Sequence, residues 1–285
     1  MKTPYAAILL LHLLILGACS APKRGCADFR AVNFSFDADE PCAGTANTGD
    51  CPCVYPKLKV LPSAEFAKNT ASGDSIIKWR AESPLQNNAG QAYFLKRFSF
   101  FISNIRLTDD KGAVFSIADS LSIPIKSSST DSGFVTIRSN PVLLGESSGT
   151  IEAGTFLYAG RFKQLNFTFG LKSPENSTNI TNVKMPVHPL NTDSMYLRNE
   201  YRLICGKFFY QTSDGKSGIV QVKDSREVSV SMPTDLYFTP ATDLILKLKI
   251  DFRKFFESVN FLTHSSSDME AAVLQNLNAV FSVSK

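Results

Sequence analysis

The sequence predicts an all-β protein: an antiparallel β-sandwich with a C-terminal helix and a small N-terminal disulfide-rich module. Three observations support this fold class. Apolar and polar residues alternate through much of the chain, the alternating segments follow one another at short spacing without helices between them, and four cysteines cluster near the N-terminus. The chain has 285 residues, 44% hydrophobic and 20% charged, which suits one large globular domain or two small ones.

The charge distribution excludes one class of function. Thirty Lys and Arg against twenty-six Asp and Glu give a formal net charge of +4. These charges are spread along the sequence, whereas a nucleic-acid-binding protein gathers its cations in one region. We therefore expect no nucleic-acid partner.

Residues 1–18 have the pattern of a lipoprotein signal peptide. A lysine precedes an apolar run over 6–16, which is about half the ~20 residues that span a bilayer and so indicates an export signal rather than a transmembrane helix. The small residues before Cys19 resemble the lipobox of bacterial lipoproteins, in which the cysteine is lipidated. We expect Cys19 to anchor the exported protein to a membrane; plain secretion with cleavage near Ala21 is the alternative.

Cys26, Cys42, Cys51 and Cys53 predict a disulfide-stapled module. An exported protein enters an oxidising space, where clustered cysteines form disulfides. Of the three possible pairings we favour Cys26 with Cys53 and Cys42 with Cys51, because this nests a short loop inside a longer one. A zinc site is the alternative, and the single residue between Cys51 and Cys53 disfavours it.

The segments 25–28 and 49–56 resemble a Cys-containing module that lies behind the lipobox in exported proteins of Bacteroidetes-type bacteria. Together with the change in pattern near residue 57, this gives two further regions after the signal peptide. The module is expected over 19–56, and the main β-sandwich domain over 57–285.

The strands of the main domain are predicted from a two-residue periodicity. The longest apolar run, 93–107, is followed by a polar turn and a short apolar segment at 113–115, which predicts a hairpin. Segments 165–171 and 228–232 alternate apolar and polar residues. The clearest alternation, over 243–252, places these residues on one face: Leu244, Leu246, Leu248, Ile250 and Phe252.

A second hairpin is expected around Asp214 and Gly215, between strands over 201–211 and 219–222. Cys205 lies in phase with the apolar residues of the first of these strands. Its thiol is therefore expected to face the core as a small hydrophobe.

One helix is predicted near the C-terminus. Ser267 and Glu270 fit a capping box, and an apolar stripe then recurs at helical spacing. The stripe consists of Val273, Leu274, Leu277, Val280 and Phe281. We expect it to pack on the sandwich rather than on a partner protein.

The sequence gives no support for an enzyme. Segment 145–149 matches the nucleophile-elbow pattern, with Asp193 and His264 following in hydrolase order, but the residues after it do not form the helix that an elbow requires. Phosphate-binding, Rossmann and zinc-protease motifs are absent. A binding protein is expected instead.

Three short sequence motifs of the main domain, in the order that the family has them, resemble the MbnP-like family, whose founders accompany methanobactin genes in methane-oxidising bacteria. Residues 98–107, FSFFISNIRL, are close to the family strand F-x-Y-Y-I-S-N-I-x-L. Residues 165–171 and 189–196 resemble its I-x-F-x-I-G-V, P-L and M-Y/F stretch, and 244–281 its closing D-x-x-x-x-F, Met-His and N-x-x-x-F words. The resemblance implies an exported β-sandwich. In founding members it also implies a copper site that uses His and an oxidised Trp, modified by a dihaem partner enzyme.

The sequence departs from the family pattern at that copper site. Both Trp of the family stretch M-x-W-x-W are missing after Met195, and Trp79 lies outside the matching words. The remaining set of possible copper ligands is His188, Met195 and His264, since imidazole and thioether suit copper. The alternative is a structural or surface-interaction lipoprotein that has kept the fold and lost the metal site.

These observations also predict the environment of the protein. No acidic run follows Cys19, which favours the periplasmic face of the outer membrane over surface display. The expected partners are the membrane, through the lipid anchor, a copper ion and a redox partner protein.

Overall fold

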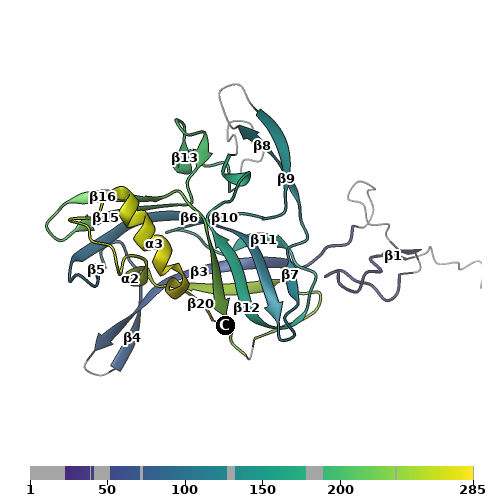
Figure 1. The fold of residues 1–285 in the computed structure, drawn as a ribbon. Coiled ribbons are helices and arrows are strands. Elements are labelled where there is room, and N and C mark those ends of the chain that lie inside the picture. The colour runs from purple at the N-terminus through teal and green to yellow at the C-terminus, as the bar shows by residue number, and fades with distance from the viewer. Residues whose placement is uncertain are drawn as a thin grey trace, which may run out of the picture. The chain divides into compact units, whose positions relative to one another are not determined.

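In the computed structural model the chain divides into two compact units, Met1–Tyr55 and Pro56–Lys285, one residue from the predicted boundary. The residues that the structure describes are 23–38, 40–41, 52–70, 73–126, 132–177, 189–234 and 236–284 (Figure 1). The signal peptide and Cys19 lie outside these ranges. No helix in the described ranges is long and apolar enough to cross a membrane.

The N-terminal unit is held by a disulfide and short-range polar contacts. Its strands β1 (Arg24–Gly25) and β2 (Glu40–Pro41) pair in parallel. Cys26 is bonded to Cys53, one of the two predicted pairings. The other pairing, Cys42 with Cys51, lies outside the described residues.

The larger unit contains two main sheets. The larger sheet has the strand order β16-β15-β6-β12-β17. Its strands are β6 (Ala92–Asp109), β12 (Gly160–Phe169), β15 (Gly206–Thr212), β16 (Ser217–Val222) and β17 (Arg226–Ser231). Short strands extend it: β5 (Pro84–Gln86), β7 (Val114–Ser116) and β10 (Val142–Gly145) pair with β6, and β18 (Tyr237–Phe238) pairs with β12. The predicted hairpins are present as β6–β7 and β15–β16.

The second sheet has the order β11-β3-β19-β20, with β4 paired to β3. These strands are β3 (Lys57–Thr70), β4 (Gly73–Lys78), β11 (Ile151–Thr155), β19 (Leu244–Ile250) and β20 (Phe281–Ser284). Two separate hairpins complete the unit: β8 (Leu121–Lys126) with β9 (Ser132–Ile137), and β13 (Tyr196–Leu197) with β14 (Arg202–Leu203). The all-β fold class is therefore confirmed.

One pairing of the second sheet departs from the antiparallel prediction. Strands β3 and β19 run parallel, with Leu58 opposite Leu244. They come from opposite ends of the unit's sequence, so no tight turn forces them to be antiparallel.

The core between the layers is rich in phenylalanine. The ring of Phe100, on the central strand β6, lies within 5.4–6.2 Å of five other rings, measured between centroids: Phe98, Phe169, Phe208, Phe255 and Phe281. The alternation predicted for β19 is confirmed, because Leu246, Leu248 and Ile250 are buried there. The buried aromatic pairs around Phe100 stabilise the core by ring–ring packing as well as by burying apolar surface.

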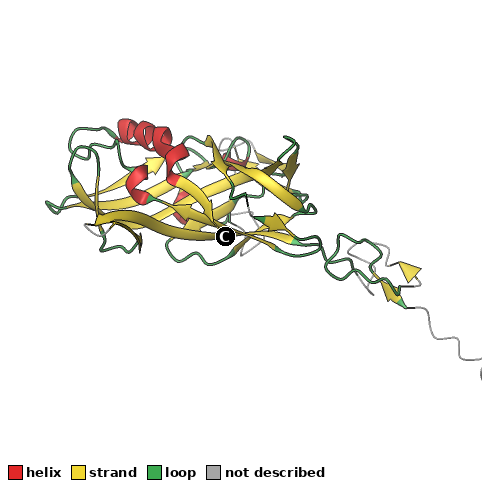
Figure 2. Ribbon diagram, turned by 90° about the horizontal axis from the view of Figure 1, so that it is seen from below, coloured by secondary structure: helices red, strands yellow, loops and turns green. Residues whose placement is uncertain are grey.

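The helices α2 (Phe252–Phe255) and α3 (Ser266–Val280) lie together at one end of the sandwich (Figure 2). The predicted strand over 243–252 stops at Ile250, because the carboxylate of Asp251 accepts the Arg253 N–H at 3.1 Å and caps α2.

The terminal helix is confirmed, but its predicted cap was wrong. The capping box is made by Ser265 and Asp268, not by Ser267 and Glu270. The Glu270 carboxylate instead accepts backbone N–H groups of the β16–β17 connection, including that of Asp224 at 2.9 Å.

The apolar stripe of α3 also ends earlier than predicted. Val273, Leu277 and Val280 are buried on the helix, whereas Phe281 begins β20. Phe281 pairs with Ile250 across the second sheet, and this pairing ends the helix.

Cys205 is a free, fully buried cysteine, as predicted, but it lies in the break between β14 and β15, because the single strand expected over 201–211 is interrupted there. Its Sγ accepts the N–H of Leu171 at 3.4 Å. Burial raises the pKa of this thiol to about 11, so it stays protonated at neutral pH.

Candidate functional site

A second, smaller apolar cluster covers part of the outer side of the larger sheet. Phe101 of β6 contributes to it, together with residues of the β8–β9 hairpin and of the segment around the 3-10 helix η3 (Asp193–Met195). Its buried members are Phe101, Ile123, Ile137, Leu171, Leu190, Met195, Leu203 and Ile204. This cluster holds the β8–β9 hairpin against the sheet.

Next to this cluster, the central strand β6 contains a bulge. Asn166 of β12 lies opposite Arg106, and Thr168 lies opposite Ser103. Between these two pairs β6 advances by three residues, whereas β12 advances by two. Asn104 takes up the irregularity in a left-handed conformation with φ of 53°, which asparagine tolerates better than most residues. Its N–H donates to the carbonyl of Ser139 at 2.5 Å. The bulge thus joins β6 to the chain that follows β9.

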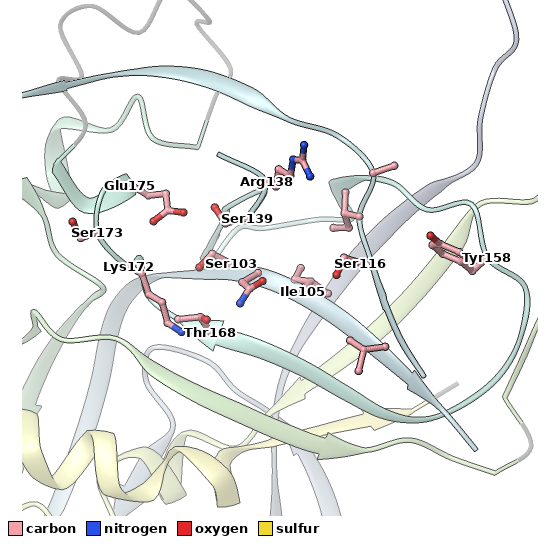
Figure 3. A pocket seen from close by; sticks show the side chains of 14 residues that line it. Ser103, Ile105, Ser116, Arg138, Ser139, Tyr158, Thr168, Lys172, Ser173 and Glu175 are labelled. Carbon is pink, nitrogen blue, oxygen red and sulfur yellow. The ribbon is translucent and has the colours of Figure 1, made fainter. Parts of the chain in front are cut away.

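This bulge forms one wall of a pocket of about 640 Å³ (Figure 3). The pocket is mainly polar. Its polar lining residues are Ser103, Asn104, Ser116, Arg138, Ser139, Tyr158, Thr168, Lys172, Ser173 and Glu175. Figure 3 shows the side chains of Ser103, Ser139 and Glu175 directed toward the same space.

Two of these side chains have an unusual burial. Glu175 is the first residue of the 3-10 helix η1 (Glu175–Ser177), and only 9% of its surface is exposed to solvent. The Ser139 hydroxyl is buried and has no hydrogen-bond partner among the described residues. An unsatisfied buried hydroxyl costs free energy, so a polar ligand that reaches it gains a favourable hydrogen bond.

An ion network closes one edge of the pocket. The Glu227 carboxylate accepts from Arg106 at 2.9 Å, from Thr168 at 3.0 Å and from Lys172. Partial burial of Glu227 raises the pKa of its carboxyl, but the hydrogen bonds from Lys172 and Thr168 and the nearby cations lower it further, so the pKa lies below its usual range. Lys172 therefore shares the Glu227 carboxylate with Arg106, and this pairing holds the wall.

The structure describes two of the three residues predicted to bind copper, Met195 and His264, and places them on different elements of the fold. Met195 is fully buried in the smaller apolar cluster. His264 lies in the loop between α2 and α3, where its Nδ1 accepts the N–H of Asn260 at 3.2 Å. His188 lies outside the described residues.

With His188 outside the described residues, the predicted copper set of His188, Met195 and His264 stays a prediction. Among the described residues, no group of three or more His, Cys, Asp and Glu side chains is placed to hold a metal. Trp79 packs its ring against Phe98, 5.2 Å away between centroids, and against Phe252. It belongs to the core and not to the pocket.

The nucleophile-elbow pattern also has no elbow geometry. Segment 145–149 turns between the strands β10 and β11, with no helix after it. The Ser148 hydroxyl accepts the Gly145 N–H at 2.8 Å and so closes this turn.

Sequence reasoning missed the pocket. Its one signal was the polar pair Ser103 and Asn104 inside the apolar run of β6, within the most specific family word. The other walls come from segments far away in the sequence, which no local pattern brings together.

The fold and the pocket define a class of protein: an all-β sandwich with a polar cavity at a bulge of its central strand. The MbnP family model matches residues 66–272, and the chain belongs to the MbnP family.

Among solved structures, the chain is similar to MbnP from Methylosinus trichosporium, with 12% sequence identity and a TM-score of 0.36. The match covers 71% of this chain and 78% of that one. A search of curated proteins gave no match.

Proposed function

We propose that this chain is an exported, lipid-anchored binding protein, not an enzyme, that has kept the MbnP fold and binds a small polar molecule in the pocket at the Asn104 bulge. The observation that carries this proposal is the pocket itself. Its volume of about 640 Å³ falls in the range of small-molecule sites.

The chemistry of the lining defines the class of ligand. Serine hydroxyls both donate and accept hydrogen bonds, and the Glu175 carboxylate accepts them. A sugar or an amino acid presents several donors and acceptors within this volume. The ligand is therefore a small molecule rich in hydroxyl or amino groups.

Thermal unfolding in the presence of single monosaccharides and amino acids tests the proposal, because a ligand that binds only the folded state raises Tm. Ser116→Trp fills the pocket from its exposed wall, and Ser231→Trp is the matched control on the exposed side of β17. We expect at least one compound to raise the Tm of the parent and of the control, but not that of Ser116→Trp. An equal response of both variants would contradict the site.

Copper binding is the second candidate, and membership of the MbnP family favours it. In this candidate His188, Met195 and His264 are the ligands, and a redox partner protein acts on the metal. Copper titration followed by dialysis tests it. Stoichiometric copper that is retained by the parent and lost by His264→Ala would support it, and no retained copper would support a fold that has lost the metal.

The anchor and the location are part of the same proposal. The signal pattern over 1–18 and the small residues before Cys19 support a lipid anchor, and the segment after Cys19, which has no acidic run, supports the periplasmic face of the outer membrane. Mass spectrometry of the mature protein is expected to show a lipidated N-terminus at Cys19. An unmodified N-terminus beyond Cys19 would remove the anchor.

A further inference from the structure

Three cations lie together on the outer face of the larger sheet, away from the pocket lining. Lys96 and Arg97 come from β6, and Lys207 comes from the neighbouring strand β15. Arg97 and Lys207 lie over the ring of Phe209, 4.7 and 5.4 Å from its centroid. Lys96 lies over the ring of Phe94 at 4.8 Å. These contacts fix the positions of the cations.

The grouping of the cations arises from an irregularity in the sheet. The register between β15 and β6 shifts between Phe209 and Tyr210, which lie opposite Arg97 and Leu95. Lys96 is the extra residue in this bulge. Two consecutive cations of one strand therefore reach the outer face, while Leu95 stays buried.

Acidic side chains do not neutralise this group. Several cations elsewhere in the larger unit are paired, such as Lys59 with Asp243 and Lys223 with Glu200. Within the described ranges, Lys96, Arg97 and Lys207 form no ion pair with Asp or Glu. The ammonium of Lys207 donates to the backbone carbonyl of Ser194 at 3.2 Å.

Apolar surface continues beside the cations. Ile219 of β16 lies directly opposite Phe209 and is 44% exposed. The rings of Phe94 and Phe209 are only partly buried. We call this surface the cation–aromatic face, formed by Phe94, Lys96, Arg97, Lys207, Phe209 and Ile219.

We propose that the cation–aromatic face docks on an anionic phospholipid surface. Lipid phosphates neutralise cations that lie near the headgroups, and apolar side chains beside them enter the boundary between headgroups and acyl chains. A purely acidic protein segment would neutralise the cations but leave the apolar surface without a partner. This inference goes beyond the proposed function, because it depends neither on the pocket nor on the lipid at Cys19.

Vesicle co-sedimentation of the chain without its signal segment, residues 19–285 carrying Cys19→Ser, tests the proposal without a contribution from the apolar signal or from a lipid anchor. The vesicles contain phosphatidylcholine either alone or mixed with phosphatidylglycerol. The test variant is Lys96→Ala, Arg97→Ala and Lys207→Ala combined. The matched control, Lys111→Ala, Arg161→Ala and Lys163→Ala combined, removes the same charge from exposed positions outside the face.

We expect binding to the anionic vesicles that weakens with salt, and at least about a tenfold loss of affinity in the test variant, since each cation near an anionic surface adds several-fold. The control is expected to lose less than about twofold. Equal losses in the two variants would overturn the proposal, because binding would then follow net charge alone. Equal binding of the parent to neutral vesicles would also overturn it.

Poly-glutamate is the probe for the competing partner. If the parent binds poly-glutamate but not the anionic vesicles, the face recognises acidic polypeptides and the lipid assignment is wrong. A folded test variant is verified by a far-UV spectrum and a Tm equal to those of the control.

Discussion

The two units of the chain are stabilised in different ways. In the N-terminal unit, Phe29 and Phe36 are 70% and 91% exposed, and the disulfide Cys26–Cys53 ties the ends of the unit together. In the larger unit, aromatic rings of both sheets and of α2 meet around Phe100, which is fully buried. A short chain cannot bury enough apolar surface to offset its conformational entropy, so covalent and polar links replace a core.

The largest effect is expected from Phe100→Ala. Removal of this ring leaves a cavity among five other rings, and such changes cost about 3–5 kcal/mol. Urea unfolding measured by circular dichroism is expected to show this loss. The control Phe36→Ala is expected to change stability by less than about 0.5 kcal/mol, since this ring is exposed. Equal effects would erase the distinction between the two units.

The next largest loss of stability is expected from removal of the disulfide, and it is expected in the N-terminal unit alone. The Cys26–Cys53 bond closes a loop with a sequence separation of 27. Loop entropy then predicts a loss of about 3.5 kcal/mol in this unit for Cys26→Ser combined with Cys53→Ser. Hydrogen exchange is expected to accelerate at residues 24–35 and to stay unchanged in β6 and β19. Acceleration in those strands would show that the disulfide also supports the sandwich.

A smaller loss of folding stability is expected from a substitution at Gly170, where the larger unit is tightly packed. A Cβ on Gly170, where φ is +88°, would lie 2.3 Å from the Cys205 Sγ. Gly112 has a φ of +87° and no atom within 4 Å of such a Cβ, so Gly112→Ala measures backbone strain alone. We expect thermal unfolding to show a loss of about 1 kcal/mol for Gly112→Ala and about 2–3 kcal/mol for Gly170→Ala.

A second substitution sharpens this test. Cys205→Gly removes both the Sγ and the Cβ that would lie 2.3 and 2.5 Å from the added Cβ, so Gly170→Ala is expected to cost less in that background than in the parent. An unchanged cost would place the strain elsewhere.

The smallest effect is a pH dependence of the N-terminal unit. The Asp28 carboxylate accepts hydrogen bonds from the side chain and backbone N–H of Arg30 and from the Tyr55 hydroxyl, and these hold its pKa far below its usual range. Because the pKa is lower in the folded state, this stabilisation is complete above about pH 4 and is lost as the pH falls further. Asp28→Asn is expected to remove the dependence below pH 4. A parent that is equally protected from exchange at pH 2 and pH 5 would contradict this account.

The parts of the fold that could be predicted from the sequence are the strands in which apolar and polar side chains alternate along the chain. The alternation at Leu244–Ile250 and the apolar run of β6 specify which face of each strand is buried and which is exposed, whatever strand lies beside it. The same pattern does not specify partners, and so the parallel pairing of β3 with β19 was missed. The cap of α3 was missed because two overlapping Ser and acid pairs fit the motif, and contacts of Glu270 from outside the helix decided between them.

The candidate site was less predictable for the same reason. Met195 has the right chemistry for a soft metal, but its residue type does not show that it is fully buried among apolar side chains. The pocket depends on one bulge that joins Asn104 to Ser139, and this long-range contact has no local signature. The Ile-Ser-Asn-Ile word identified the family and also marked this wall.

The most direct test of the central claim is a high-resolution crystal structure of the mature protein soaked with copper and with the compound that most raises its Tm, with anomalous data collected at the copper edge. We predict density for the compound within hydrogen-bond distance of Ser139 or Glu175, and no ordered copper on Met195 or His264. A copper ion held by His264 together with His188, beside an empty pocket, would contradict the account and restore the family's metal site.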